Sequence, residues 1–216
     1  MELVEIGAHA IQKCSRNSGM YDYRPKPNSM AYFLSKELMK SIKPSSILLA
    51  IILFLAGCSV SVQSYKNEKP ELIVEKFFVG DLTAYGVVAE RSGKVIKRFS
   101  CDMRGTWDRK TLSLDEDFLW SDGTRQRRVW HLTRKSDGTF SGTADDVVGD
   151  AFGEVAGNTF HLVYDLSVPV EGSETVLHVD DWLYLVTDSV IINRSKLTKF
   201  GLHAADVFLT IQRKGS

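Results

Sequence analysis

The sequence predicts an all-β fold, an antiparallel up-and-down β-barrel, and three observations predict it. Apolar and polar side chains alternate along several segments, which is the pattern of a strand with one buried face. Turn-forming pairs separate these segments at a spacing of about 8–15 residues, which favours an antiparallel sandwich or barrel. A single meander of about nine or ten strands would also leave two exposed edges unless the sheet closes. We therefore favour a barrel over a sandwich.

The clearest alternating segment follows the turn at Ser92-Gly93. Its strand would place Val95, Lys97, Phe99, Cys101 and Met103 on one face. Further alternating segments lie at 112–120, 129–132, 160–168, 175–187 and 204–213. The other turn signals are Asp108-Arg109, Asp122-Gly123, Asp137-Gly138, Gly149-Asp150, Gly157-Asn158 and Glu171-Gly172-Ser173. Asp-Gly and Ser-Gly pairs supply the positive φ angles that tight hairpins need.

Helical signals are few and short. Residues 70–78 can form one or two turns, with Pro70 at a permitted first position. We expect another short helix from Ser195 to Gly201. The sequence therefore predicts a barrel with one or two short helical turns.

The N-terminal part of the chain predicts export. Residues 47–56 are all apolar, and lysines at positions 36, 40 and 43 precede them. A basic flank, a short apolar core and small residues at its end are typical of a secretory signal peptide. A membrane-spanning helix needs ~20 apolar residues, so this run is too short for one. A buried core helix or an uncleaved anchor fits these flanks less well.

The end of the apolar run is similar to a bacterial lipobox. Leu55-Ala56-Gly57-Cys58 carries the resemblance, which implies cleavage before Cys58 and acylation of that residue. The membrane would then be a partner through the acyl chains, since more than one chain gives stable anchoring. Because Ser59 rather than aspartate follows, the resemblance also implies the periplasmic face of the outer membrane.

On this interpretation the chain has three parts. Residues 1–57 are a signal peptide with an upstream extension, residues 58–70 a lipidated flexible tether, and residues 71–216 the barrel domain. Prolines and scattered charges are unusual ahead of the basic flank of a signal peptide. Translation is therefore expected to start at Met30 or Met39 rather than at Met1.

Composition excludes some classes of function. Residues 58–216 hold 20 Lys and Arg against 23 Asp and Glu, a net charge of −3, because residues 1–57 carry seven of the 27 basic and four of the 27 acidic residues. No basic stripe remains, so nucleic acid is not an expected partner.

Cys14 precedes the expected start and Cys58 would carry lipid. Cys101 is then left alone, without a disulfide or a thiolate metal site, and we expect it to be a small buried side chain.

Polar residues gather in the second half of the chain. The candidate polar cluster comprises Asp145, Asp146, Asp180, Asp181, Arg194 and Lys199. They lie in the motifs Asp137-Gly138-x-x-x-Gly142-x-Ala144-Asp145-Asp146-Val147-Val148-Gly149, Gly157-Asn158, Asp180-Asp181-Trp182-x-Tyr184, Asn193-Arg194-Ser195 and Lys199-Phe200-Gly201. From about Phe77 to the C-terminus, the chain resembles a proteobacterial lipoprotein family, domain of unknown function 3833. The resemblance implies an exported lipoprotein and does not imply any activity. Members of the family are often encoded beside enzymes that modify fatty acids, which points to lipid handling.

Three functions remain open, and the one we favour is a lipocalin-like barrel that binds or carries an apolar ligand, such as a fatty acid or other lipid. It would need neither catalysis nor a cofactor. A small closed barrel either fills its interior with side chains or holds one ligand. Gly105-Thr106-Trp107 matches the Gly-x-Trp pattern of lipocalins, but three residues show no kinship. The candidate pocket aromatics are Trp107, Trp130, Tyr164, Trp182 and Tyr184, and a solid core is the alternative for them.

The second function is a lipid-modifying isomerase or hydrolase. Asp145 or Asp146 would pair with Asp180 across strands, because neighbours on one strand point to opposite faces. These aspartates would otherwise be structural, in ion pairs with Arg194 and Lys199. The chain has no Gly-x-Ser-x-Gly or His-Glu-x-x-His motif and its histidines are dispersed, so no metal site is predicted.

The third function is a non-catalytic part of an envelope assembly that uses the outer face of the barrel. The arginines of Arg125-Gln126-Arg127-Arg128, which we expect to be exposed, would meet an anionic head group or a protein partner. A solvated start of a strand is the simpler explanation of such a run.

Overall fold

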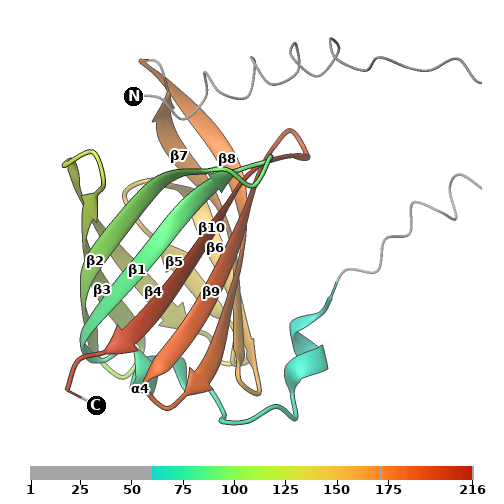
Figure 1. Ribbon diagram of the computed structural model, residues 1–216. Coiled ribbons are helices and arrows are strands. Elements are labelled where there is room, and N and C mark those ends of the chain that lie inside the picture. The colour runs from blue at the N-terminus through green and yellow to red at the C-terminus, as the bar shows by residue number, and fades with distance from the viewer. Residues whose placement is uncertain (1–59, 171, 216) are drawn as a thin grey trace, which may run out of the picture. The chain divides into compact units, whose positions relative to one another are not determined.

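The computed structural model describes residues 60–170 and 172–215 (Figure 1). The predicted signal peptide, Cys58 and the candidate start methionines lie outside the described residues. Within the described residues, no helix combines the length and the apolar character that a membrane crossing requires.

In the described part of the chain, ten antiparallel strands close into one barrel, which confirms the predicted fold class. Each strand pairs with its neighbours in sequence, and β1 pairs with β10 to close the sheet, from Leu82 opposite Arg213 to Glu90 opposite Ala205. The strands are β1 (Gly80–Glu90), β2 (Val95–Trp107), β3 (Thr111–Trp120), β4 (Arg125–Arg134), β5 (Phe140–Thr143), β6 (Val147–Ala156), β7 (Thr159–Val170), β8 (Ser173–Thr187), β9 (Val190–Lys199) and β10 (Leu202–Arg213). All strands that the structure describes, and the core that they share, lie within residues 60–215, so this part of the chain has a hydrophobic core of its own, as an independently folding domain does.

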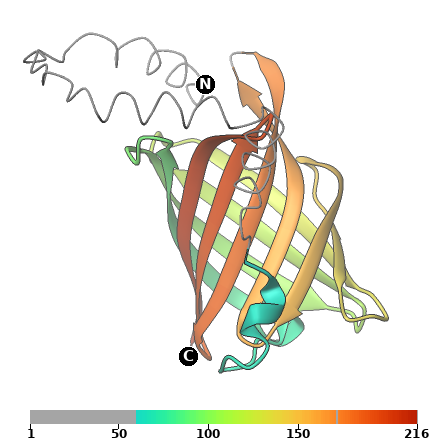
Figure 2. The ribbon, with the colours of Figure 1, turned by 90° about the vertical axis from the view of Figure 1, so that its right-hand side faces the viewer.

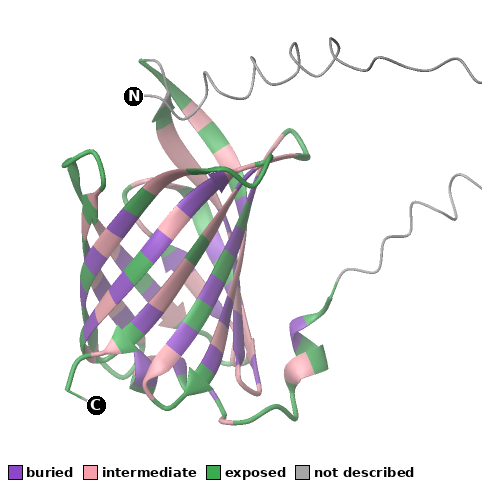
Figure 3. Ribbon diagram, in the orientation of Figure 1, coloured by how far each residue is buried: buried purple, intermediate pink, exposed green. Residues whose placement is uncertain are grey.

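Alternation along the strands decides which side chains face the interior. In β2, Phe99, Cys101 and Met103 are buried, as the sequence predicted, and the residues between them are not. Figure 3 shows the same alternation along the other strands. Cys101 is a free thiol among the described residues, and burial raises its pKa above the ordinary value. It therefore stays protonated and packs as a small apolar side chain.

Two helical turns precede β1 in the described chain. The α-helix α4 (Val74–Phe77) falls within the predicted range 70–78, and the 3-10 helix η1 (Val62–Tyr65) precedes it. The second predicted helix, Ser195 to Gly201, is wrong, because residues 195–198 pair with both β8 and β10 as part of β9. Ser195 and Leu197 are both buried with an exposed residue between them, which is a strand period.

The segment around α4 covers one end of the barrel (Figure 1). Its most buried side chains, none more than 4% exposed, are Leu72, Val74, Phe77 and Phe78. Gly105 permits the close approach, since a Cβ there would lie 1.8 Å from the carbonyl oxygen of Phe78. Arg213 donates hydrogen bonds to three backbone carbonyl oxygens between Lys76 and Val79. This end of the barrel is therefore closed by a fixed segment.

The η1 segment packs on the outside of the barrel wall (Figures 1 and 2). Val62 is only 2% exposed. The Tyr65 ring lies 6.1 Å from the Trp182 ring and 5.6 Å from the Tyr184 ring, measured between centroids. The described part of the predicted tether thus contains a turn that is seated on the barrel.

Candidate functional site

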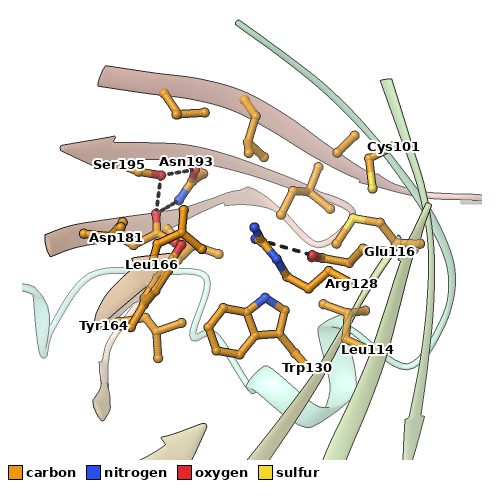
Figure 4. Close-up of a pocket in the computed structure, with 18 of the residues that line it drawn as sticks. Cys101, Leu114, Glu116, Arg128, Trp130, Tyr164, Leu166, Asp181, Asn193 and Ser195 are labelled. Carbon is orange, nitrogen blue, oxygen red and sulfur yellow. Dashed lines mark hydrogen bonds and ion pairs between the residues drawn. The ribbon is translucent and has the colours of Figure 1, made fainter. Parts of the chain in front are cut away.

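The interior of the barrel contains a partly open cavity of about 170 Å³ (Figure 4). Phe78 contributes to its floor at the α4 end. We therefore place the opening toward the opposite end, where connections join β1 to β2, β3 to β4, β5 to β6, β7 to β8 and β9 to β10. An engineered cavity of about 150 Å³ binds benzene. Pockets for drug-sized ligands begin at about 300 Å³. The cavity therefore has room for a ring or a short apolar chain.

Apolar side chains form most of the cavity wall. Of the predicted pocket aromatics, Trp130 and Tyr164 line the cavity, with their ring centroids 5.1 Å apart and their planes at 80°. Leu114, Leu132 and Leu162 add aliphatic surface. An apolar guest would bury its surface here, which stabilises the complex by about 25 cal/mol for each Å² removed from water.

A polar group interrupts this apolar wall. Its members, drawn in Figure 4, are Glu116 of β3, Arg128 of β4, Asp181 of β8, and Asn193 and Ser195 of β9. Each lies at an inward position of its strand. Glu116 stands between Leu114 and Phe118, and Asp181 between Val179 and Leu183, whereas Arg128 follows Gln126 and precedes Trp130 at this period. The signal for Glu116 was present in the sequence, because it shares its alternating row with leucines, Phe118 and Trp120.

Arg128 is the cation of this group, and its side chain is only 14% exposed. Its Nε and Nη2 atoms donate to Asp146 Oδ2 at 2.9 and 2.7 Å, and its guanidinium lies over the rings of Phe118 and Trp130. Burial alone would lower the pKa of Arg128, but the negative charges of Glu116 and Asp146 raise it above its ordinary value. The expectation that Arg128 is exposed is wrong, because the period of β4 places it on the same inner face as Trp130.

Glu116 is 8% exposed and its Oε2 atom has no hydrogen-bond partner among the described residues. The nearest cationic atom recorded, Arg128 Nη1, is 3.9 Å away, beyond hydrogen-bond distance. Burial raises the pKa of Glu116 from 4.5 to about 7, although Arg128 opposes the shift. The side chain therefore exchanges a proton near neutral pH.

Asp181 is the second interior acid. It accepts hydrogen bonds from Asn193 Nδ2 and from Ser195 Oγ, the latter at 2.8 Å. Burial nevertheless raises its pKa from 3.8 to about 6. Tyr164, also buried, has a pKa raised mainly by burial and further by the charge of Asp181, so its phenol stays neutral.

The structure divides the predicted polar cluster. Asp181 lies inside the barrel, and Asp146 reaches the same group through Arg128. Asp180 lies on the outer face, because it precedes Asp181 on the same strand, and Asp145 is exposed. Arg194 is also on the outside, 3.5 Å from Asp206, and Lys199 lies over the ring of Phe200 at the tip of its hairpin. Asp180 therefore does not meet Asp145 or Asp146.

The remaining pocket aromatics do not line the cavity. Trp182 and Tyr184 alternate with Leu183 and therefore face outward, where they contact η1. Trp182 Nε1 donates to Asp180 Oδ1 at 2.9 Å, and the Trp182 ring stacks on His161 with centroids 4.0 Å apart. Trp107 is half-buried at the end of β2, packed against the core. The spacing of these residues was visible in the sequence, but not which face of the sheet lies inward.

The residues that the structure describes contain no group of three His, Cys, Asp or Glu side chains placed to hold a metal ion. The two carboxyl groups of the inner polar group, with Asp146 beside them, accompany the guanidinium of Arg128.

Residues 52–213 match the family model described as Protein of unknown function (DUF3833). The chain belongs to the DUF3833 family. The match spans every strand of the barrel, so the cavity and its polar group lie within the family's domain. The resemblance drawn from the sequence motifs is confirmed at the level of the family. No curated protein gives a significant match to this DUF3833 chain.

Among solved structures, the DUF3833 barrel is similar to the S-type phycobiliprotein lyase CPES from Guillardia theta, with a TM-score of 0.51 and 12% identity over 67% of this chain and 94% of that chain. At this identity the likeness shows the fold, and it supports the expected lipocalin-like barrel. The redesigned β-barrel mFAP0, bound to DFHBI, also matches, at a TM-score of 0.34 and 15% identity over 63% of this chain and 99% of that chain. The redesigned barrel b11L5F_LGL matches with a TM-score of 0.36 and 15% identity over 67% of this chain and 99% of that chain.

Proposed function

We propose that this protein binds or carries an apolar, lipidic ligand inside its barrel while acyl chains on Cys58 hold it at the periplasmic face of the outer membrane. The observation that carries the binding proposal is the cavity, which is closed at the α4 end, partly open and mostly apolar. Concave apolar sites with a few convergent polar groups are the usual form of small-molecule sites.

The enzyme alternative depends on an aspartate pair that the fold keeps apart. Asp180 engages His161 and Trp182 on the outer wall, whereas Asp146 is bound to Arg128 at the interior. A binding module is therefore the function that the geometry supports best.

The anchoring part of the proposal rests on the sequence. The apolar run at 47–56 and the lipobox-like Leu55-Ala56-Gly57-Cys58 motif precede the barrel directly. Since η1 is seated on the wall only four residues after Cys58, the anchor would hold the barrel close to the membrane surface.

The binding proposal is tested by filling the cavity. Leu162 lines it and is 5% exposed, and Leu162→Trp should occupy part of its volume. We expect this variant of the barrel, residues 60–216, to bind the small fluorescent hydrocarbon naphthalene at least about tenfold more weakly than the unmodified barrel, because the probe loses apolar contact area. Val163→Trp is the matched control, since the adjacent side chain faces outward.

Equal naphthalene affinity of a folded Leu162→Trp variant and the unmodified barrel would place binding elsewhere and contradict the proposal. Organic extraction of the purified barrel followed by mass spectrometry provides an independent measurement. An acyl-containing species that co-purifies with the unmodified barrel, and is depleted in the Leu162→Trp variant, is the expected result.

A further inference from the structure

One acceptor atom faces the cavity without a partner. Glu116 lines the cavity and is more than nine-tenths buried, and its Oε2 atom accepts no hydrogen bond from any described residue. Figure 4 shows the side chain pointing toward Arg128 across the interior. An unpaired buried acceptor is costly, so a group that donates a hydrogen bond to it would bind favourably.

The guanidinium of Arg128 is already occupied by carboxylates. Two of its donors are bonded to Asp146 and the third nitrogen is turned toward Glu116. Near the mouth, Lys97 lies at an inward position of β2, and its Nζ donates to Asp122 at 2.9 Å. In the described interior, the cations are therefore each committed to a carboxylate.

The balance of charge around the cavity is consequently acidic. Glu116 and Asp181 line the cavity and Asp146 binds Arg128 beside it, so three carboxyl groups accompany one guanidinium. A carboxylate brought by a ligand would meet an excess of like charge in a desolvated place, with no uncommitted cation to pair with it.

We propose that the polar end of the ligand is a hydrogen-bond donor, a hydroxyl or an ammonium group, which Glu116 binds, and that the cavity discriminates against ligands that end in a carboxylate. This inference rests on the proposed function and specifies its ligand class. The ligand is then an amphiphile with a ring or short chain as its apolar body and an uncharged or cationic head. A long-chain alcohol or amine fits this description, and a free fatty acid with its head in the interior does not.

The protonation of Glu116 tunes this preference. Burial raises the pKa of Glu116 to about 7, so the fraction of Glu116 in the carboxylate form increases as the pH rises from 5.5 to 8.5. The carboxylate attracts an ammonium group more strongly than the neutral acid does. The titratable groups that face it from the surrounding elements are Cys101 of β2, Arg128 of β4, Asp146 before β6, Tyr164 of β7 and Asp181 of β8. Cys101 and Tyr164 stay neutral and Arg128 stays cationic over this range, whereas Asp181, with a pKa of about 6, changes in the same sense as Glu116.

The test compares three probes of one chain length, octylamine, 1-octanol and octanoate, on the barrel of residues 60–216. Displacement of naphthalene and isothermal titration calorimetry at pH 7.5 give the affinities. We expect octylamine to bind about tenfold or more tightly than octanoate, with 1-octanol between them, because a hydrogen bond to a charged group discriminates by at least that factor. Octylamine should also gain affinity relative to 1-octanol between pH 5.5 and pH 8.5.

Glu116→Gln should bind octylamine about tenfold more weakly and octanoate more tightly. Asp117→Asn removes a carboxylate from the adjacent residue, which is exposed on the outer face, and should change neither affinity. The inference is overturned if octanoate binds the unmodified barrel as tightly as octylamine does. It is also overturned if the ratio of the octylamine and 1-octanol affinities does not vary with pH. Either result leaves the cavity as a binding site. If naphthalene binds the Leu162→Trp variant as tightly as the unmodified barrel, the proposed function itself fails.

Discussion

The raised pKa of Glu116 makes the stability of the barrel depend on pH in a defined direction. The folded state holds a proton on Glu116 up to about pH 7, whereas the unfolded chain releases it near 4.5. Between these values the folded state binds more protons than the unfolded state, so the free energy of unfolding falls as the pH rises. The stabilising effect of the protonated form is complete below pH 4.5 and is lost above pH 7.

The size of the effect follows from the two pKa values. Each pKa unit corresponds to ~1.4 kcal/mol, so a shift from 4.5 to about 7 amounts to about 3 kcal/mol of lost stability at pH 8. Glu116→Gln keeps the shape and stays neutral at every pH. We therefore expect this variant to be about as stable as the unmodified barrel at pH 4.5 and about 3 kcal/mol more stable at pH 8.

Urea unfolding followed by circular dichroism at pH 4.5, 6 and 8 measures this difference. Asp181 contributes a pH dependence of the same sign, but it is present in both proteins and largely cancels in the comparison. Asp117 is on the exposed face, so the free energy of unfolding of Asp117→Asn should differ from that of the unmodified barrel by the same amount at each pH. A difference between Glu116→Gln and the unmodified barrel that stays constant from pH 4.5 to pH 8 would refute the reasoning.

Three further outcomes are expected. Cys58→Ala should leave an unprocessed, unacylated precursor in the full chain, and normal processing and membrane fractionation of that variant would refute the lipobox interpretation. Gly105→Ala should lower the free energy of unfolding by about 1–3 kcal/mol, measured by urea denaturation, because the added Cβ collides with the Phe78 carbonyl oxygen and displaces the segment that closes the barrel. Trp182→Ala should speed tryptic cleavage after Lys66, which is exposed, because η1 loses an aromatic contact on the wall; an unchanged cleavage rate would show that this contact does not hold the segment.

The strands and the turns between them were predictable because their signals are local. Alternation along Val95 to Met103 needs only the period of a strand, and Asp-Gly and Ser-Gly pairs need only the backbone angles of a tight turn. The false helix at Ser195 to Gly201 shows the limit of local signals, since pairing on both sides of β9 decided the conformation of that segment.

The candidate site was predictable only in part. Trp130 and Tyr164 line the cavity, whereas Trp182 and Tyr184 have the same chemistry and lie outside it. Arg128 was expected in solvent, although it is the only cation that lines the described cavity. Alternation separates a strand into two faces without saying which face is inner, unless the two differ strongly in polarity.

By itself the sequence determined that this chain is a meander of antiparallel strands, that an apolar run and a lipobox-like motif precede it, and that it belongs among DUF3833 proteins. The tertiary structure alone decided that Glu116, Arg128 and Asp181, which lie up to 65 positions apart, meet inside the barrel, and that Asp180 does not join them. The physical reason is that closure of the sheet sets the register around the barrel and gives each strand an inside. Burial of these side chains and the excess of carboxylates affect ligand binding only in the closed barrel.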